Sequence, residues 1–199
     1  ELQANPDGRY DLEDVEKSMP HMDDTYESRL QTALVSLKQN SSKIFTKEHL
    51  LKYSPKFLHM LENIEDPENS GLHLIYSQFR TLEGIGVFKL VLEENGFIHF
   101  KLMKNELGVY VADIDPEDIG KPAFALYTGT ESEEEKEIIR SIYNNDWSDL
   151  TSPMQESLKQ ISTSNVMGEV IKVLMISSSG AEGINLKNVR FVHITEPYW

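Results

Sequence analysis

The spacing of apolar residues changes near Gly71. Before this position, apolar side chains in residues 23–39 recur every three or four residues, which predicts an amphipathic helix. A second helix is predicted through "KFLHMLENIED", because Ser54 can cap its first turn and Pro55 suits its first position. The segment "DPENSG" ends that helix. Residues 1–20 are polar and contain Pro and Gly, so we expect them to form a linker.

After Gly71, short apolar runs alternate with segments of helical spacing. The predicted strands are "LHLIYSQF", "AFALYTG", "VIKVLMIS" and "VRFVHIT", which lack a clean alternation of apolar and polar residues. The predicted helices between them are "TLEGIGVFKLVLEENG", which closes at Gly96, "TESEEEKEIIRSIYN" and "DLTSPMQESLKQIS". Apolar strands separated by helices predict an α/β fold, with a parallel sheet covered by helices on both faces.

Two segments of this pattern carry further expectations. "FIHFKL" and "GVYVAD" are predicted to form either a hairpin or inserted strands. The helix in "TESEEEKEIIRSIYN" has acidic residues in its first turns, where the helix dipole favours negative charge. These residues are Glu131, Glu133, Glu134 and Glu135.

The charge of the chain excludes one mode of nucleic-acid binding. The 199 residues carry 19 basic and 33 acidic side chains, a net charge of −14. Bulk attraction to a polyanion therefore cannot supply the affinity. Nucleic acid would have to be held by local backbone amides and a few placed side chains. With 39% hydrophobic residues, the chain can still build a sizeable core.

The chain has no cysteine, which excludes disulfides and thiolate metal sites. We recognise no secretory leader, and no apolar run approaches the ~20 residues of a membrane span. We therefore expect an intracellular protein that makes no membrane contact. Because the first residue is Glu1 rather than Met, we also expect the chain to be part of a longer polypeptide.

A Gly-rich turn, "SSSGAEGINL", follows one predicted strand. Gly180 and Gly183 permit backbone conformations that expose N–H groups, and the three serines add hydroxyl groups. Open α/β sheets place ligands at the carboxyl ends of their strands, so this chemistry suits a phosphate. A tight strand-to-helix turn without a ligand is equally compatible with the pattern.

Two other patterns invite a ligand but are better explained without one. Gly84 and Gly86 follow a strand, but Lys89 stands where a dinucleotide fingerprint needs its third glycine, so we expect a close helix contact. In "DIDPEDIG", Asp118 occupies the place of the glycine that a Ca²⁺ loop requires. The six histidines show no metal-ligand spacing, and we assign no metal to this chain.

Three blocks, in this order, resemble a known family: "HLIYSQF", "ALYTGTESEEEKEIIRSIYNNDW" and "VLMISSSGAEGINLKNVRFVHITEPYW". They are similar to motifs IV, IVa and V of the second RecA-like domain of superfamily 2 helicases of the Swi/Snf type. "GAEGINLKNVRFVHITEPYW" is similar to the NTPase/helicases of nucleocytoplasmic large DNA viruses. The resemblance implies a three-layer RecA-like lobe at residues 54–199, preceded by a linker and mostly helical segment at residues 1–53.

The resemblance also implies which residues contact nucleic acid. After the first strand these are Ser77, Gln78 and, as a further candidate, Phe79; after a later strand, the turn would lend backbone amides and a hydroxyl to a phosphate. Thr130 in that turn could instead cap the following helix, and the two roles are compatible. The remaining implied contacts are Thr128, Gly129, Thr130 and Ser177.

The nucleotide side of the family's cleft matches the Gly-rich turn. Gly180, Glu182, Gly183 and Asn185 occupy the matching positions, with Asn185 at the position that contacts the ribose. Glu182 departs from the Leu or Arg of other branches, so a solvated surface carboxylate is an alternative for it.

Parts of the family's catalytic machinery are missing from this sequence. It contains no G-x-x-x-x-G-K-[ST] loop and no D-E-x-x box, and it ends before the Gln-x-x-Gly-Arg-x-x-Arg of motif VI. ATP and Mg²⁺ are therefore expected in the full-length protein, with the Mg²⁺ ligands outside this chain. We expect no ATP hydrolysis by these residues alone.

Together these features predict the C-terminal motor lobe of an ATP-dependent translocase or helicase acting on nucleic acid, with double-stranded DNA expected. Its partners would be the N-terminal RecA-like lobe of the same polypeptide and transcription machinery, in host cytoplasm, nucleus or virion. The acidic composition and the missing motif VI are equally compatible with a non-catalytic docking or scaffold module in a viral transcription or packaging assembly.

Overall fold

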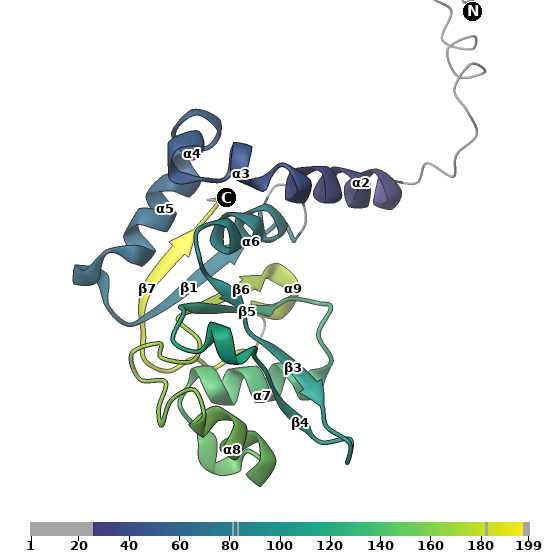
Figure 1. Cartoon of the computed structure of the whole chain (residues 1–199), viewed down its shortest axis with the longest axis vertical. Coiled ribbons are helices and arrows are strands. Elements are labelled where there is room, and N and C mark those ends of the chain that lie inside the picture. Colours follow the sequence, from purple (N-terminus) through teal and green to yellow (C-terminus); the bar gives the residue numbers. More distant parts are fainter. Residues whose placement is uncertain (1–25, 81, 83, 182, 197–199) are drawn as a thin grey trace, which may run out of the picture.

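A five-stranded parallel sheet forms the centre of the computed structural model, which describes residues 26–80, 82, 84–181 and 183–196 (Figure 1). The strand order is β2-β5-β6-β1-β7, and neighbouring strands all pair in parallel. This confirms the α/β fold with a parallel sheet. The strands are β1 (Leu72–Ser77), β2 (Ile98–His99), β5 (Ala123–Tyr127), β6 (Val173–Ser177) and β7 (Val189–Ile194).

Each face of the sheet has its own hydrophobic cluster, because successive residues of a strand point to opposite faces. Along the central strand β6, Val173 and Met175 belong to one cluster, and Leu174 and Ile176 belong to the other. Every residue of β6 is buried, which explains why its sequence shows no alternation of apolar and polar residues. The sheet is therefore the middle layer of three.

Helices from the N-terminal part of the chain cover the face that contains Val173 (Figure 1). The Ser54 hydroxyl accepts a hydrogen bond from Phe57 N at 3.4 Å, which confirms the predicted helix start. Leu50 is buried in the same cluster as this helix, and the domain boundary at residue 54 stays a prediction. These helices are α2 (Tyr26–Gln39), α3 (Ser41–Ile44), α4 (Lys47–Tyr53), α5 (Pro55–Glu65) and α6 (Ile85–Glu94), with a 3₁₀ turn η1 (Pro67–Asn69).

The helices α7 (Glu133–Tyr143) and α8 (Ser152–Lys159) lie on the opposite face (Figure 1). Tyr143 fixes α7 to the sheet, because its hydroxyl donates to the His73 carbonyl at 2.9 Å. Two further 3₁₀ turns, η2 (Pro116–Asp118) and η3 (Trp147–Asp149), precede β5 and α8. None of the helices that the structure describes has the length and apolar character needed to cross a bilayer.

The segment between α6 and β5 divides into two parts. Strand β2 joins the main sheet beside β5, whereas β3 (Lys101–Lys104) and β4 (Tyr110–Asp113) form a separate antiparallel hairpin. The hairpin lies against α8, where Ala112 N donates to the Ser157 hydroxyl at 3.1 Å. Both alternatives for this segment are thus partly right: one strand is inserted into the sheet, and a hairpin follows it.

The start of α7 differs from the sequence-based expectation. Ser132 is the N-cap, and it forms a reciprocal capping box with Glu135: the Ser132 hydroxyl accepts from Glu135 N at 3.2 Å, and Glu135 Oε2 accepts from Ser132 N at 2.8 Å. The expectation that Thr130 caps this helix is therefore wrong. Glu131 precedes the N-cap of α7, so the prediction that it lies in the first turn of this helix is wrong. The first turn contains the other three predicted residues, Glu133, Glu134 and Glu135.

Candidate nucleic-acid and nucleotide interface

The carboxyl ends of the parallel strands bring the residues predicted to contact nucleic acid to one edge of the sheet. In the strand register, Ser77 pairs with Ser177 and Tyr127 pairs with Ile176, so β5, β6 and β1 end side by side. We call this region the carboxyl edge. Within the described residues it comprises 77–79, 128–131, 177–181 and 195–196. Open α/β sheets bind ligands at such an edge.

The predicted nucleic-acid residues of the carboxyl edge differ in their exposure. The side chains of Ser77, Thr128 and Ser177 are buried, with Ser77 fully inaccessible. A ligand that approaches this edge first meets exposed residues, which are Gln78, Phe79, Gly129 and Thr130. The structure therefore brings all these positions together but offers only part of them to a partner.

A carboxylate closes the turn after β5. In this β5 turn, residues 128–131, the Glu131 Oε2 atom accepts from Thr128 N at 2.6 Å and from the Thr128 hydroxyl at 3.1 Å. The Thr130 hydroxyl donates to Glu131 Oε1 at 2.8 Å. Both carboxylate oxygens are thus hydrogen-bonded to the donors that the resemblance assigns to a phosphate.

A second carboxylate closes the turn after β1. In this β1 turn, residues 77–79, the Ser77 hydroxyl donates to Glu196 Oε2 at 2.9 Å, and Gln78 N donates to the same oxygen at 3.1 Å. Phe79 N donates to the Ser77 hydroxyl at 3.1 Å, which folds the turn onto the end of β1. Glu196 arrives from the end of β7, so this closure depends on the pairing of β1 with β7.

Sequence reasoning did not single out either carboxylate for this role. Glu131 was placed in the first turn of a helix, although Thr128 and Glu131 have the T-x-x-E spacing of a capping box, which could have revealed their contact. Glu196 carries no such signal, because its partners Ser77 and Gln78 are remote in sequence.

Two glycines keep the carboxyl edge compact. A Cβ added to Gly84 would overlap the Ser77 hydroxyl and the Phe79 carbonyl oxygen, and one added to Gly180 would overlap the Tyr127 carbonyl oxygen. Gly84 therefore allows the start of α6 to lie in close contact with the residues that follow β1, as the sequence predicts. Gly180 lies within the short helix α9 (Ser178–Ala181), where it is buried, and its contact with a nucleotide stays a prediction.

The predicted nucleotide loop leads from α9, at the carboxyl edge, back to the start of β7, and it has an exposed part and a hydrogen-bonded part. Gly183 has a φ of +71° with open space around it, and the Asn185 side chain is exposed. The buried amide of Asn144 holds this loop: its Nδ2 donates to the Asn185 carbonyl at 2.9 Å, and its Oδ1 accepts from Lys187 N at 2.7 Å. Asn144 is a positioning residue that sequence reasoning missed. The predicted site residue Glu182 lies outside the described residues.

The exposed groups of this loop suit a peripheral contact with a nucleotide. The backbone at Gly183 and the amide of Asn185 can offer hydrogen bonds to polar atoms of a base or ribose. Across the described ranges, no group of three or more His, Asp or Glu side chains is placed to hold a metal ion.

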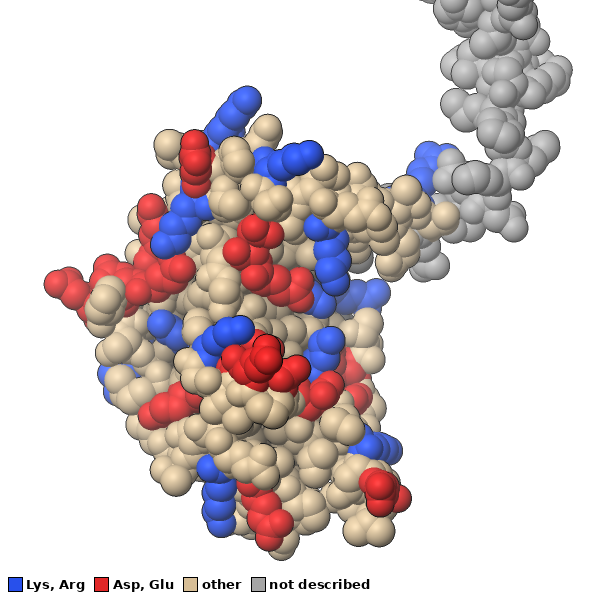
Figure 2. All heavy atoms as spheres, viewed as in Figure 1, with Lys and Arg blue, Asp and Glu red and all other residues tan. Residues whose placement is uncertain are grey.

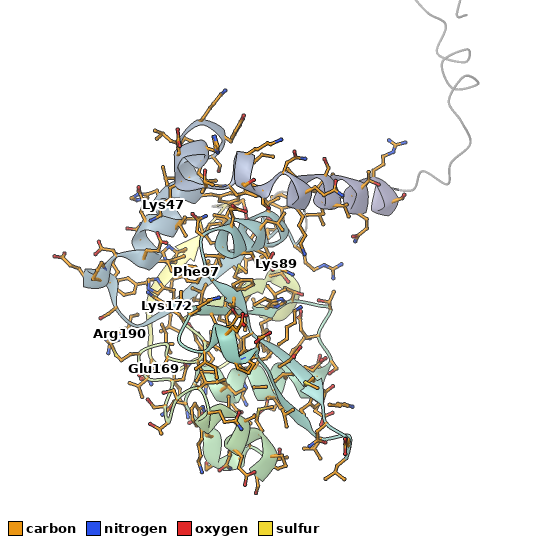
Figure 3. All side chains as sticks on the ribbon, in the orientation of Figure 1. Lys47, Lys89, Phe97, Glu169, Lys172 and Arg190 are labelled. Carbon is orange, nitrogen blue, oxygen red and sulfur yellow. The ribbon has the colours of Figure 1, made fainter. Side chains whose placement is uncertain are left out.

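Basic side chains are not concentrated at the carboxyl edge. Figure 2 shows acidic and basic residues interspersed over the face that it presents. Lys172 and Arg190, labelled in Figure 3, lie at the amino ends of β6 and β7, the opposite edge of the sheet. Near the carboxyl edge, Arg80 is exposed, and Lys56 Nζ donates to the Thr195 carbonyl at 3.2 Å. Any anion bound there would rely mainly on amides and hydroxyls.

Two stacked histidines join β1 to β7 near the amino end of β1. The rings of His73 and His193 have centroids 5.4 Å apart, and His73 Nδ1 lies 3.1 Å from His193 Nε2. Because His73 Nε2 faces the Asn69 carbonyl at 3.0 Å, we assign the proton to Nε2 and the acceptor role to Nδ1. Burial lowers the pKa of His73 to about 4, and it also lowers the pKa of His193. The pair is therefore neutral near pH 7.

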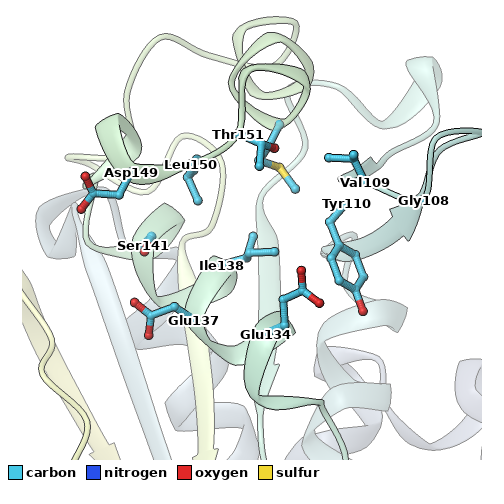
Figure 4. Close-up of a pocket in the computed structure, with 11 residues that line it drawn as sticks. Gly108, Val109, Tyr110, Glu134, Glu137, Ile138, Ser141, Asp149, Leu150 and Thr151 are labelled. Atoms are coloured by element: carbon cyan, nitrogen blue, oxygen red, sulfur yellow. The ribbon is translucent and has the colours of Figure 1, made fainter.

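A cavity of about 380 Å³ lies away from the carboxyl edge, between α7, the β3–β4 hairpin and the segment leading into α8 (Figure 4). Its lining includes the apolar side chains of Ile138 and Met154 and the carboxylates of Glu134 and Asp149. None of the residues predicted to contact nucleic acid or nucleotide lines this cavity. It is a separate feature of the α7 and α8 side of the molecule.

Comparisons with known proteins find relatives among viruses. A candidate ATP-dependent RNA helicase of Acanthamoeba polyphaga mimivirus is 30% identical over 148 aligned positions, 74% of this chain and 20% of the relative. Termination factor NPH-I homologs of African swine fever virus are 33% identical over 167 positions, 73% of this chain and 21% of theirs. A second candidate mimivirus RNA helicase is 26% identical over 207 positions, 87% of this chain and 16% of the relative.

The chain thus spans about one fifth of the length of the curated relatives it matches. No protein-family model matches it, and no solved structure matches it significantly.

Proposed function

Because this chain is homologous to part of the viral superfamily 2 helicases and NPH-I homologs, we propose that it is the C-terminal motor lobe of an ATP-dependent nucleic-acid translocase or helicase. The observation that carries this proposal is the meeting of three separate sequence blocks at the carboxyl edge. The ends of β1, β5 and β6 lie side by side there, in the order β5-β6-β1. A motor lobe needs this juxtaposition, since nucleic acid and nucleotide must act on one rigid unit.

The nucleic-acid face of the proposed lobe is the exposed part of the carboxyl edge. Gln78, Gly129 and Thr130 are exposed, so an approaching phosphate meets these residues first. The buried hydroxyls of Ser77, Thr128 and Ser177 would contribute after local rearrangement. With few basic side chains nearby, such contacts position the backbone and read no sequence. We propose double-stranded DNA as the substrate.

The nucleotide face is the loop that contains Gly183 and Asn185. It follows directly on β6 and α9, whose Gly180 packs against the end of β5. A nucleotide that moves this loop would therefore also shift α9, and this shift would be transmitted to the β5 turn. ATP supplies the phosphoanhydride whose cleavage drives such a motor, and the N-terminal lobe of the same polypeptide would hold its phosphates and Mg²⁺. The name of the NPH-I homologs supports transcription as the setting.

The proposal is tested by DNA binding of this chain at low ionic strength. Fluorescence anisotropy with a labelled duplex DNA should detect binding, and Gln78→Ala and Thr130→Val should each weaken it roughly threefold to tenfold, the worth of one net hydrogen bond. Ser148→Ala, which changes an exposed serine on η3, should leave it unchanged. The chain alone should not hydrolyse ATP with or without DNA.

Two outcomes would overturn the motor-lobe proposal. Absence of binding to both duplex DNA and duplex RNA at low salt would favour the non-catalytic docking or scaffold module. DNA-stimulated ATP hydrolysis by this chain alone would contradict the division of the catalytic groups between two lobes. Tighter binding to duplex RNA than to duplex DNA would keep the motor and correct its substrate.

A further inference from the structure

The donors of both turns at the carboxyl edge are already occupied by an anion from the chain itself. We propose that Glu131 and Glu196 are internal competitors of phosphate, so that the edge takes up a phosphate only by exchanging a carboxylate for it. The exchange is a property of this chain. Only the identification of the phosphate as nucleic-acid backbone rests on the proposed function.

The β5 turn has the donor set of a phosphate site. One backbone amide and one hydroxyl of Thr128 converge on a single oxygen, and the Thr130 hydroxyl meets the second oxygen of the same carboxylate. Amides and hydroxyls that converge on oxyanions bind carboxylates and phosphates through the same charge-assisted hydrogen bonds. A phosphate placed on these donors would occupy the volume that the Glu131 carboxylate now fills.

The β1 turn repeats this arrangement with a different occupant. The Ser77 hydroxyl and Gln78 N converge on Glu196 Oε2. The other oxygen, Glu196 Oε1, is buried and has no hydrogen-bond partner within the residues that the structure describes. A buried carboxylate oxygen without a donor costs free energy. Glu196 is therefore held less completely than Glu131.

An external phosphate must overcome two advantages of each internal carboxylate. The carboxylate is tethered beside its donors, which gives it a high effective concentration. It also repels an incoming anion for as long as it stays nearby. These effects make the carboxylates specificity-determining residues: they exclude weak or singly bound anions, and they admit a polyanion that brings several phosphates at once.

The two carboxylates should leave by different routes. Glu131 is partly exposed and precedes α7, so rotation of its side chain carries the charge into solvent. Glu196 is less accessible at its Oε1 atom, and the Lys56 ammonium donates to the carbonyl of its neighbour Thr195. Release of Glu196 therefore requires movement of the chain after β7. The β5 turn should accept phosphate first.

The test uses inorganic phosphate as the probe and the amide signals of Thr128 and Gln78 as reporters, followed by proton–nitrogen NMR. The Glu131→Ala chain should show a saturable shift of Thr128 at a phosphate concentration roughly tenfold lower than the unmodified chain, because the competing negative charge is gone. Glu196→Ala should do the same for Gln78. Glu134→Ala removes an exposed carboxylate of α7 that makes no bond to the turn, and it should behave like the unmodified chain.

A conservative variant separates the lost charge from any change of structure. Glu131→Gln keeps an oxygen that can accept from Thr128 N but lacks the negative charge, so its affinity for phosphate should lie between those of the unmodified chain and Glu131→Ala. Equal phosphate affinity in all variants would overturn the proposal. So would a gain in Glu134→Ala as large as that in Glu131→Ala, because net charge alone would then explain it.

Duplex DNA as a second probe separates this inference from the proposed function. If Glu131→Ala gains affinity for phosphate but neither form binds DNA, the exchange stands and the motor-lobe proposal fails. If the unmodified chain binds DNA but Glu131→Ala binds DNA and phosphate no more tightly, the motor lobe stands and the exchange fails.

Discussion

The β5 turn and the β1 turn both bind a carboxylate of the chain, but the two carboxylates come from different distances in the sequence. In both, an amide and a hydroxyl at the end of a strand hold a carboxylate. The β5 turn takes its carboxylate from Glu131, three residues after Thr128, and bonds both oxygens. The β1 turn takes it from Glu196, 119 residues after Ser77, and leaves one oxygen without a partner. A local contact forms with its own segment, whereas the remote contact exists only when β7 pairs with β1.

Acid should have the largest effect on the stability of the sheet that carries both turns. The folded pKa of His73 is about 4 and that of His99 about 3, both lowered mainly by burial, against 6.5 in the unfolded chain. The unfolded chain therefore binds more protons below pH 6.5, and the free energy of unfolding falls as the pH drops towards 4. At about pH 5, each histidine should cost about 2 kcal/mol relative to pH 7.

Urea denaturation at the two pH values measures this loss, and two variants divide it between the regions. His73→Gln should remove the part that belongs to β1 and β7. His99→Gln should remove the part that belongs to β2 and β5, where the His99 ring stacks on Phe124. If both variants keep the full pH dependence, other groups control the acid response.

Steric crowding at either turn should lower the free energy of unfolding by a similar amount. Gly84→Ala forces a methyl group against the β1 turn, and Gly180→Ala forces one against the last carbonyl of β5. Because backbone atoms must move in each case, we expect each substitution to lower the free energy of unfolding by about 3 kcal/mol. Gly120→Ala is the control: it has open space but a φ of +92°, so it should cost only about 1 kcal/mol of backbone strain.

Chemical denaturation gives all three values. A cost for Gly84→Ala or Gly180→Ala no larger than that of Gly120→Ala would show that the edge can adjust without strain. A large cost at one glycine and a small cost at the other would identify the turn that is built more rigidly.

The smallest expected effect concerns only the local turn. Ser132→Ala breaks the capping box at the start of α7, which directly follows the β5 turn, and should lower the free energy of unfolding by about 1 kcal/mol. The amide signal of Thr128 should shift while that of Gln78 stays in place. Ser148→Ala should change neither quantity, and a shift at Gln78 in Ser132→Ala would show that the two turns are coupled.

The local parts of the fold could be predicted from the sequence. The apolar runs predicted the strands that form the sheet, and Ser54 before α5 together with Pro55 at its first position predicted the first turn of this helix. The start of α7 was harder, because Thr128 and Ser132 are both followed three residues later by a glutamate. Only the second pair begins a helix; the first makes a similar hydrogen bond without one.

The remote parts of the candidate site could not be predicted in this way. No local pattern joins Glu196 to Ser77, or Asn144 to the loop at Asn185. Hydrophobic periodicity also gave no sign that the hydroxyls of Ser77, Thr128 and Ser177 would be buried, since small polar residues at strand ends fit either setting. The roles of the site residues in binding nucleic acid and nucleotide stay predictions.

The most direct test of the account is a map of duplex DNA on the chain by proton–nitrogen NMR at low ionic strength. We predict that the largest amide shifts fall on Gln78, Gly129 and Thr130, with small shifts at Lys172 and Arg190 on the opposite edge of the sheet. Largest shifts at Lys172 and Arg190, or at the cavity beside α8, would contradict the assignment of the carboxyl edge as the nucleic-acid face.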